Sequence, residues 1–247
     1  MRRQSAPAFA LLLLLAPVAA TAEDWSGRLT VYGWFTALDV EATVTGPRGR
    51  TATGGGSADI GEVFDALNFA FFANAELRRG RWGLMGDLVY ADLNFHRTTP
   101  RGVRRDLDLN SVLGTALVAW RAYEDERASF DLMGGARVVS METVVSRAGP
   151  RVSLRLAATE TWVDPVIGVR GRYAIGERTS LFALGNIGGF GMGSEFSWEV
   201  TAGVSHDLTE RLTGEAAFRS LSIDHDAGAV DQTIEMYGPM LGLSVRF

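Results

Sequence analysis

The feature that most constrains this chain is an alternation of apolar and polar residues that recurs in long segments along almost its whole length. Leu29 and Val31, for example, flank Thr30. A period of two residues is that of a β-strand with one apolar face, whereas an α-helix repeats every 3.6 residues. Ten segments carry this pattern, at residues 28–35, 69–78, 82–90, 107–123, 130–139, 163–173, 179–190, 196–208, 212–223 and 233–247.

The lengths of these segments favour a membrane-spanning fold. Most have ten residues or more, whereas strands of soluble proteins usually have about five or six. A tilted strand needs about 9 to 11 residues to cross a membrane. We therefore predict an all-β fold, a single antiparallel transmembrane β-barrel of about ten strands, with eight strands as the alternative.

The connections between the segments also alternate, because tight turns are interleaved with longer loops. This arrangement is typical of bacterial outer-membrane barrels, in which the short turns lie in the periplasm and the longer loops are extracellular. The longer connections are residues 40–67, 97–106, 142–159, 188–193 and 224–232.

The N-terminus has the three parts of a secretory signal peptide. Met1-Arg2-Arg3 is a basic start, residues 9–15 are a short apolar run, and Ala20-Thr21-Ala22 offers a small-residue cleavage pattern. The run is too short for a transmembrane helix, and no later window has the roughly 18 consecutive apolar residues that such a helix needs. We expect a signal peptide at residues 1–22 and an outer-membrane β-barrel domain at residues 23–247.

The last segment alternates up to the final residue of the sequence, with Tyr237, Leu241, Leu243, Val245 and Phe247 on one face. An alternating last strand that ends on Phe resembles the membrane-insertion signal of bacterial outer-membrane β-barrel proteins. Further matching pieces resemble an uncharacterised family of small Gram-negative outer-membrane barrels; they are residues 31–34, 79–85 with Asp87, the spacing of Trp162, Pro165, Gly168 and Arg170, and residues 188–190 and 238–242.

This resemblance spans nearly the whole mature chain and implies a fold and a location but no reaction. The implied location is the outer membrane of a Gram-negative bacterium. The implied partners are outer-membrane lipid and, during insertion, periplasmic chaperones and the barrel-assembly machinery.

If the apolar faces meet lipid, the polar faces line the lumen and carry a balanced set of charges. A ten-stranded barrel is only slightly wider than one that side chains nearly fill, so these charges must pair or remain hydrated. The sequence favours a filled, salt-bridged interior over a narrow polar pore. The predicted lumen charge network is Arg28, Glu76, Arg78, Asp87, Asp131, Arg137, Asp164, Arg170, Arg172, Glu195, Glu199, Glu215, Arg219 and Arg246.

One group of residues has the parts of a hydrolytic site. His225 lies between Asp224 and Asp226, shortly after Ser220 and Ser222, and a histidine held by a carboxylate near a serine can activate a nucleophile. A solvated loop rich in Asp and Gly explains the same residues without chemistry, and we favour that interpretation.

Composition excludes other kinds of site. There is no Cys, so thiolate zinc sites, iron-sulfur clusters and disulfides are excluded. A net charge of -5 argues against a nucleic-acid partner. The residues from Asp106 to Asn110 begin like a calcium loop, but Ser111 and Leu117 replace the Gly and Glu that such a loop requires. We expect no cofactor and no metal.

The first long loop contains an apolar group with helical spacing, Ile60, Val63, Phe64 and Leu67, preceded by Asp59 as a possible N-cap. It could form a short amphipathic helix on the rim or a plug in the lumen. We favour an irregular cluster packed under neighbouring loops.

Taken together, the sequence predicts a monomeric, non-enzymatic integral outer-membrane protein, either a structural or surface-interaction barrel or a narrow pore for small solutes. The alternatives are a hydrolase of the outer rim (a protease or lipid hydrolase) that uses His225 and a soluble periplasmic β-barrel binding protein.

Overall fold

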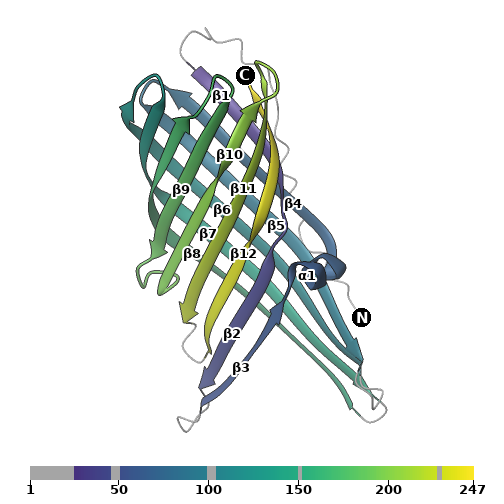
Figure 1. The fold of residues 1–247 in the computed structure, drawn as a ribbon. Coiled ribbons are helices and arrows are strands. Elements are labelled where there is room, and N and C mark those ends of the chain that lie inside the picture. The colour runs from purple at the N-terminus through teal and green to yellow at the C-terminus, as the bar shows by residue number, and fades with distance from the viewer. Residues whose placement is uncertain (1–24, 46–50, 99–103, 150–151, 227–229) are drawn as a thin grey trace.

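The computed structural model describes residues 25–45, 51–98, 104–149, 152–226 and 230–247, so the predicted signal peptide lies outside the described residues. Ten strands form a closed antiparallel barrel (Figure 1), in which each strand pairs with its neighbour and β1 pairs with β12. The elements are β1 (Trp25–Trp34), β2 (Ala37–Thr45), β3 (Thr51–Ala58), α1 (Ile60–Ala66), β4 (Leu67–Arg79), β5 (Trp82–Thr98), β6 (Arg104–Glu124), β7 (Ala128–Gly149), β8 (Val152–Ala174), β9 (Thr179–Gly189), β10 (Phe196–Asp207), β11 (Leu212–Asp226) and β12 (Val230–Arg246).

The prediction of a ten-stranded barrel is confirmed, and the eight-stranded alternative is wrong. The two ends of the barrel differ. One end, at the top of Figure 1, carries the tight turns and the C-terminus, and at the other end the long strands β5 to β8 extend furthest. We call them the short-turn end and the long-strand end. Among the described residues, no helix is long and apolar enough to cross a membrane.

The barrel wall is apolar on its outside. Large apolar side chains such as Leu84, Val163 and Ile167 are exposed there, as contact with lipid requires. Exposed aromatic side chains lie near the short-turn end on Trp25, Trp82, Tyr123 and Tyr173, as in the interfacial girdles of membrane barrels. A soluble barrel would place its charges outside and its apolar face inside, so the transmembrane barrel is the arrangement that fits.

The five residues of the predicted insertion signal lie on this outer face. Each is exposed; they are Tyr237, Leu241, Leu243, Val245 and Phe247.

The tight turns of the short-turn end are closed by side-chain oxygens. Asp125 accepts hydrogen bonds from the backbone N–H groups of Arg127 and Ala128 at 2.8 and 2.6 Å, and Thr209 accepts from Leu212 at 3.0 Å. Such bonds stabilise turns because they replace a missing backbone partner. The Tyr123 hydroxyl also donates to Asp125 and, with these N–H groups, holds the pKa of its carboxyl below its usual range.

At the long-strand end, the structure corrects the predicted loops. Strands β7 and β8 continue through most of residues 142–159, and β2 and β3 form a hairpin within residues 40–67. These parts were predicted as loops because the regular alternation of apolar and polar residues stops there. Backbone hydrogen bonds alone can continue a strand where neither face has to meet lipid.

The predicted irregular cluster in the first loop is also wrong, because residues 60–66 form the helix α1. Asp59 accepts from the Glu62 backbone N–H, and the Glu62 side chain accepts from the Asp59 N–H, which is a complete capping box. The helix buries Val63 and Ala66 and contacts β2, β3 and β5. It therefore lies at the rim and does not form a plug.

The hairpin of β2 and β3 continues the barrel wall, because β12 changes partner along its length. Residues 240–246 of β12 pair with β1, and residues 230–237 pair with β2. The chain passes from β1 to β2 directly against Gly238, where a Cβ atom would lie 1.9 Å from the Phe35 carbonyl oxygen. Only glycine allows this close approach.

Candidate functional site

The lumen is the candidate site, and its charged side chains form three clusters. The cluster nearest the short-turn end, which we call the rim cluster, consists of Arg28, Arg172, Asp207, Glu215 and Arg246. Arg28 Nη1 lies 3.5 Å from Glu215 Oε1, and Arg246 forms an ion pair with Asp207. Arg172 donates a hydrogen bond to Ser205 Oγ at 3.2 Å.

The second cluster, the wall cluster, joins Glu76, Arg78, Arg121, Asp131 and Arg170. Arg170 binds Glu76 and Asp131 at 2.8 and 2.7 Å. Arg78 lies 3.0 Å from each of the same two carboxylates, and Arg121 contacts Asp131 at 2.5 Å. Asp131 is almost fully buried, and three guanidinium groups offset the cost of burying its negative charge.

The third cluster, the central cluster, crosses the middle of the barrel with Tyr32, Asp87, Arg137, Glu199 and Arg219. Arg219 binds Asp87 at 2.9 Å and Glu199 at 3.0 Å, and Arg137 binds Glu199 at 2.5 Å. The Tyr32 hydroxyl donates to Asp87 at 2.8 Å. Arg137 has no exposed surface and Arg219 is 3% exposed, so almost no solvent reaches these two guanidinium groups.

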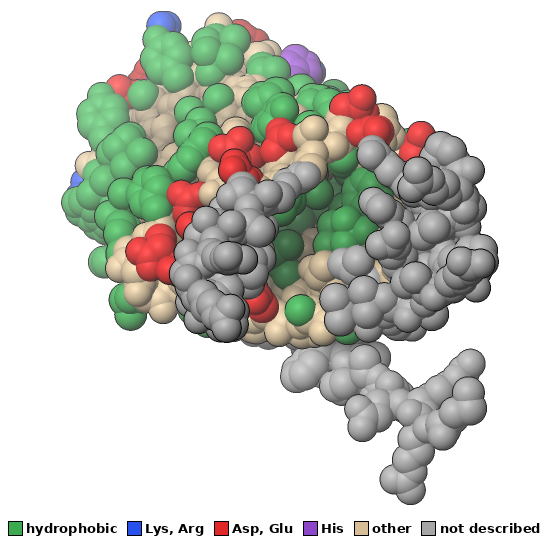
Figure 2. All heavy atoms as spheres, turned by 90° about the horizontal axis from the view of Figure 1, so that it is seen from below, with side chains coloured by type: hydrophobic (Ala, Val, Ile, Leu, Met, Phe, Trp, Pro, Cys, Tyr) green, Lys and Arg blue, Asp and Glu red, His purple; other side chains and the backbone are tan. Residues whose placement is uncertain are grey.

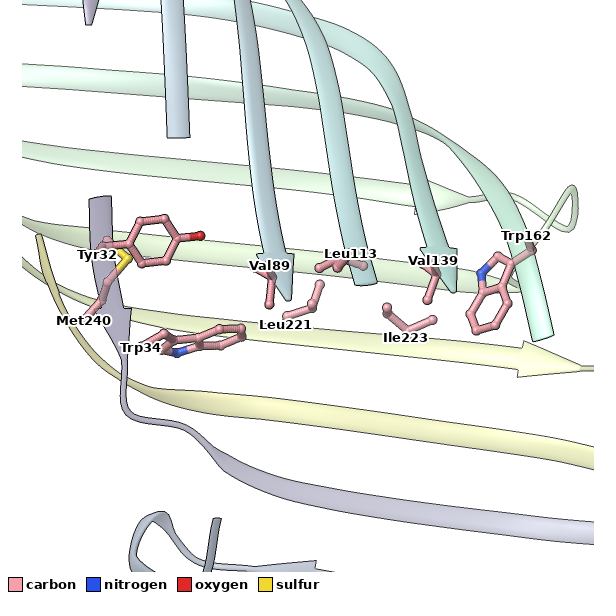
Figure 3. Packing of buried hydrophobic residues seen from close by; sticks show 9 residues of the cluster. All are labelled: Tyr32, Trp34, Val89, Leu113, Val139, Trp162, Leu221, Ile223 and Met240. Carbon is pink, nitrogen blue, oxygen red and sulfur yellow. The ribbon is translucent and has the colours of Figure 1, made fainter. Parts of the chain in front are cut away.

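An apolar layer follows the central cluster toward the long-strand end, because Leu221 and Ile223 are the next inward positions of β11 after Arg219. Figure 3 shows the side chains of this layer. Leu221 has no exposed surface, and Ile223 and Val139 are nearly as buried. The Arg219 guanidinium lies 4.9 Å from the centre of the Trp34 ring, which joins the two layers. The members of the layer are Tyr32, Trp34, Val89, Leu113, Val139, Trp162, Leu221, Ile223 and Met240.

Between the central cluster and the short-turn end lies a cavity of about 780 Å³. Ser26, Glu124 and Phe247 line it at the mouth, and Asn186, Glu199 and Arg219 line its inner end. The central cluster and the apolar layer lie at its other side.

Beyond the apolar layer, His225 is held in place on several sides. Its ring stacks on Trp162 with 3.9 Å between the ring centres and 4° between the planes. Nδ1 lies 3.0 Å from the Gly193 carbonyl oxygen, and Nε2 lies 4.0 Å from Glu160 Oε2. Ser220 and Ser222 lie on the opposite face of β11, since they differ from His225 by odd numbers of residues. The predicted serine and histidine are therefore not brought together.

Asp164 and the turn before β10 complete this outer region. Ser194 donates to Asp164 through its backbone N–H at 2.6 Å and its hydroxyl at 2.8 Å, and it accepts from Trp162 Nε1 at 2.8 Å. Gly193 also packs against Asp164, because a Cβ atom there would lie 2.5 Å from Asp164 Oδ1. This region holds the turn against the barrel mouth.

The structure places thirteen of the fourteen residues of the predicted charge network on the inner face of the barrel. Glu195 is the exception, because it is exposed in the turn between β9 and β10. Asp164 faces inward but binds Ser194 instead of an arginine. Arg121 and Asp207 were not predicted, although each shares a face of its strand with inward-facing residues such as Leu117 and Ser205.

No group of three His, Asp or Glu side chains that could hold a metal ion is found in the part of the chain that the structure describes.

Comparisons with known proteins agree with the fold. No protein-family model matches the chain, and no curated protein sequence does. The outer-membrane protease OmpT from Escherichia coli has a similar structure, with a TM-score of 0.63 and 9% identity over 92% of this chain and 98% of that chain. The translocator domain of the autotransporter NalP from Neisseria meningitidis matches with a TM-score of 0.49 and 11% identity over 90% of this chain and 88% of that chain.

The attachment invasion locus protein Ail of Yersinia pestis matches with a TM-score of 0.38 and 11% identity, over 91% of this chain and 99% of that chain. At such low sequence identities a structural similarity establishes the fold alone. The similarity to OmpT is the one that supports the fold. The chain has the fold of bacterial outer-membrane β-barrel proteins.

Proposed function

We propose that this protein is a non-enzymatic, monomeric outer-membrane barrel whose lumen is closed and whose long-strand end is a surface for interaction outside the cell. The single observation that carries the proposal is the pair of adjacent closed layers in the lumen. The charges of the central cluster are paired with one another, its Arg137 and Arg219 side chains are almost fully buried, and the apolar layer beyond it offers no polar path to an ion. A narrow pore for small solutes would need a continuous wet path.

The proposed orientation places the short turns in the periplasm and the long strands outside the cell. It also includes export with cleavage after Ala22, and insertion with the help of periplasmic chaperones and the barrel-assembly machinery. The outward-facing residues Leu241 and Leu243 of β12, with Phe247 directly after it, support membrane insertion because they present an alternating apolar face.

The surface at the long-strand end supports a role in interaction. Figure 2 shows a hollow at this end with hydrophobic side chains at its floor and acidic side chains near it. Helix α1 exposes Phe64 and Ile60, and the turn after β9 exposes Met192. Exposed apolar groups of this kind on a polar rim are typical of interaction surfaces.

A hydrolase of the outer rim is the alternative, and the similarity to a protease such as OmpT is in fold only. His225 stacks on Trp162 and contacts Gly193, and Ser220 and Ser222 are on the other side of its strand. These contacts support a structural role for His225. The alternative predicts hydrolysis that His225→Ala abolishes, whereas the proposed function predicts no such activity.

The test of a closed lumen is electrical. We expect residues 23–247, refolded into a planar bilayer, to give a heat-modifiable barrel without discrete conductance steps. A variant with Arg219, Leu221 and Ile223 all changed to Ala removes one wall of both layers and should conduct. A matched variant with Leu241→Ala and Leu243→Ala on the lipid-facing side should remain silent. Discrete steps from the unchanged protein would overturn the proposal.

A further inference from the structure

The cavity at the short-turn end has the size and lining of a ligand site. Its volume of about 780 Å³ lies within the range of about 300–1,000 Å³ that is usual for small-molecule pockets. Its lining combines several arginines with apolar side chains of β5, β6 and β9. The proposed closed lumen contributes only the inner wall of this cavity.

The arginines around the cavity differ in whether they have a carboxylate partner. In the wall cluster, Arg78 and Arg170 each lie near both Glu76 and Asp131, and Arg121 lies near Asp131. In the central cluster, two arginines face Asp87 and Glu199. In the rim cluster, three arginines share two carboxylates, Asp207 and Glu215. The arginine without an ion-pair partner therefore belongs to the rim cluster.

Arg172 is this arginine. Within the described ranges it has no carboxylate within 4.0 Å, and the hydrogen bond to Ser205 is the polar contact of its side chain. The charged groups that act most strongly on it are two other arginines, Arg28 and Arg246, followed by Asp207 and Glu215. A guanidinium among like charges in a partly desolvated cavity favours an added anion.

Three arginines that line the cavity also have an unsatisfied hydrogen-bond donor. Arg78 Nη1, Arg219 Nε and Arg246 Nε are buried and have no hydrogen-bond partner. Buried donors without acceptors are uncommon in folded proteins because each costs free energy. The lining of the cavity is therefore rich in donors.

The cavity also has an apolar side. Phe182 is the cross-strand partner of Arg172, and Leu184 packs against a buried group that includes Met85 and Leu117. These four apolar side chains would contact hydrocarbon more favourably than water. The two kinds of lining therefore suit a ligand that has an anionic group at one end and an apolar chain at the other.

We propose that the cavity binds an organic anion, a carboxylate or a phosphate ester with a short apolar chain, with its anionic group on Arg172 and Arg28 and its chain against Phe182 and Leu184. The ligand enters from the short-turn end, since the proposed closed lumen bounds the cavity on the other side. The anion can be a soluble compound or the headgroup and part of the chain of a lipid.

The experiment uses residues 23–247 in nanodiscs of phosphatidylcholine, with hexanoate as the probe and isothermal titration calorimetry as the readout. Empty nanodiscs correct for partitioning. We expect saturable binding of one hexanoate per barrel and affinities about tenfold weaker or more for hexanol and inorganic phosphate, because each lacks one of the two interactions. Equal binding of hexanol and hexanoate would overturn the proposal.

Three variants test the assigned residues. Arg172→Gln should weaken hexanoate binding about tenfold while the heat-modifiable mobility of the barrel is kept. Phe182→Ser should weaken hexanoate binding without changing the response to inorganic phosphate. Arg127→Gln removes a charge from an exposed turn at the same end and should change nothing. An Arg172→Gln protein that binds hexanoate like the unchanged protein would refute the assignment.

Two further measurements identify the source of the anion and separate this proposal from the closed lumen. Phosphatidylglycerol in the nanodiscs should compete with hexanoate if the ligand is a lipid, and should have no effect if it is a soluble compound. Conductance is recorded on the same samples. A silent barrel that does not bind hexanoate refutes only the anion site, and a conducting barrel that binds it refutes only the closed lumen.

Discussion

The membrane-spanning barrel differs from its extension at the long-strand end, which consists of β2, β3 and α1. Different interactions stabilise the two regions. In the barrel, lipid requires an apolar outer face and the narrow lumen requires paired charges, as for Arg137 and Glu199. In the extension, the β2–β3 hairpin depends on backbone pairing, and α1 depends on its capping box. Substitutions in the barrel should therefore lower the free energy of unfolding of the whole protein, whereas substitutions in the extension should have smaller effects that stay local.

The largest effect is expected at the centre of the barrel. Arg137→Met leaves Glu199 with one guanidinium partner in a layer without solvent, and breaking a buried ion pair in this way costs about 3–5 kcal/mol. Arg28→Met is the matched control, because its side chain is 25% exposed and its ion pair is long. Unfolding by urea, followed by heat-modifiable mobility, measures both. If both variants lost the same free energy of unfolding, buried charges would not stabilise the barrel more than charges at the rim.

An intermediate effect is expected at the junction between the two regions. Gly238→Ala places a Cβ atom against the Phe35 carbonyl oxygen, so the passage from β1 to β2 must shift, at a cost of about 1–3 kcal/mol. Gly86→Ala in β5 is the control, because a Cβ atom there meets nothing within 4 Å. The same urea titration should separate the two. A stable Gly238→Ala barrel would mean that the junction is not tightly packed.

The smallest effect is expected in the extension. Asp59→Ala removes the cap of α1, which costs about 1 kcal/mol, and the loss should be confined to the helix. Hydrogen exchange of residues 60–66 should become faster, while the urea midpoint of the barrel stays the same. A lowered midpoint would mean that α1 and the barrel unfold together.

The same difference explains how far the sequence could predict the fold. Alternation located all ten strands because the membrane forces one face of each to be apolar, as with Leu84 and Val163. Outside the membrane that requirement ends, so β3, with three consecutive glycines, was predicted as a loop. Its pairing with β2 depends on a partner strand and not on its own side chains.

Within the lumen, sequence parity found which charges face inward but not their partners. Arg170 and Glu76 are 94 residues apart in the chain, and only the order and stagger of the strands bring them together. The apolar layer was missed altogether. Its signal was a local loss of alternation at the same depth in neighbouring strands, where Leu88-Val89, Val112-Leu113 and Val138-Val139 each place apolar residues on both faces.

The division of β12 between two partners has a consequence for the time course of folding. The first and last barrel strands are joined by seven residue pairs between β1 and β12, and β2 adds eight more with the same strand. Contacts between residues so distant in the chain form late, because the entropy of closing a long loop is lost before the contacts stabilise the fold. The β2–β3 hairpin needs only local contacts and can form early. It then offers β12 a ready edge, so that barrel closure becomes the extension of an existing ladder from the long-strand end.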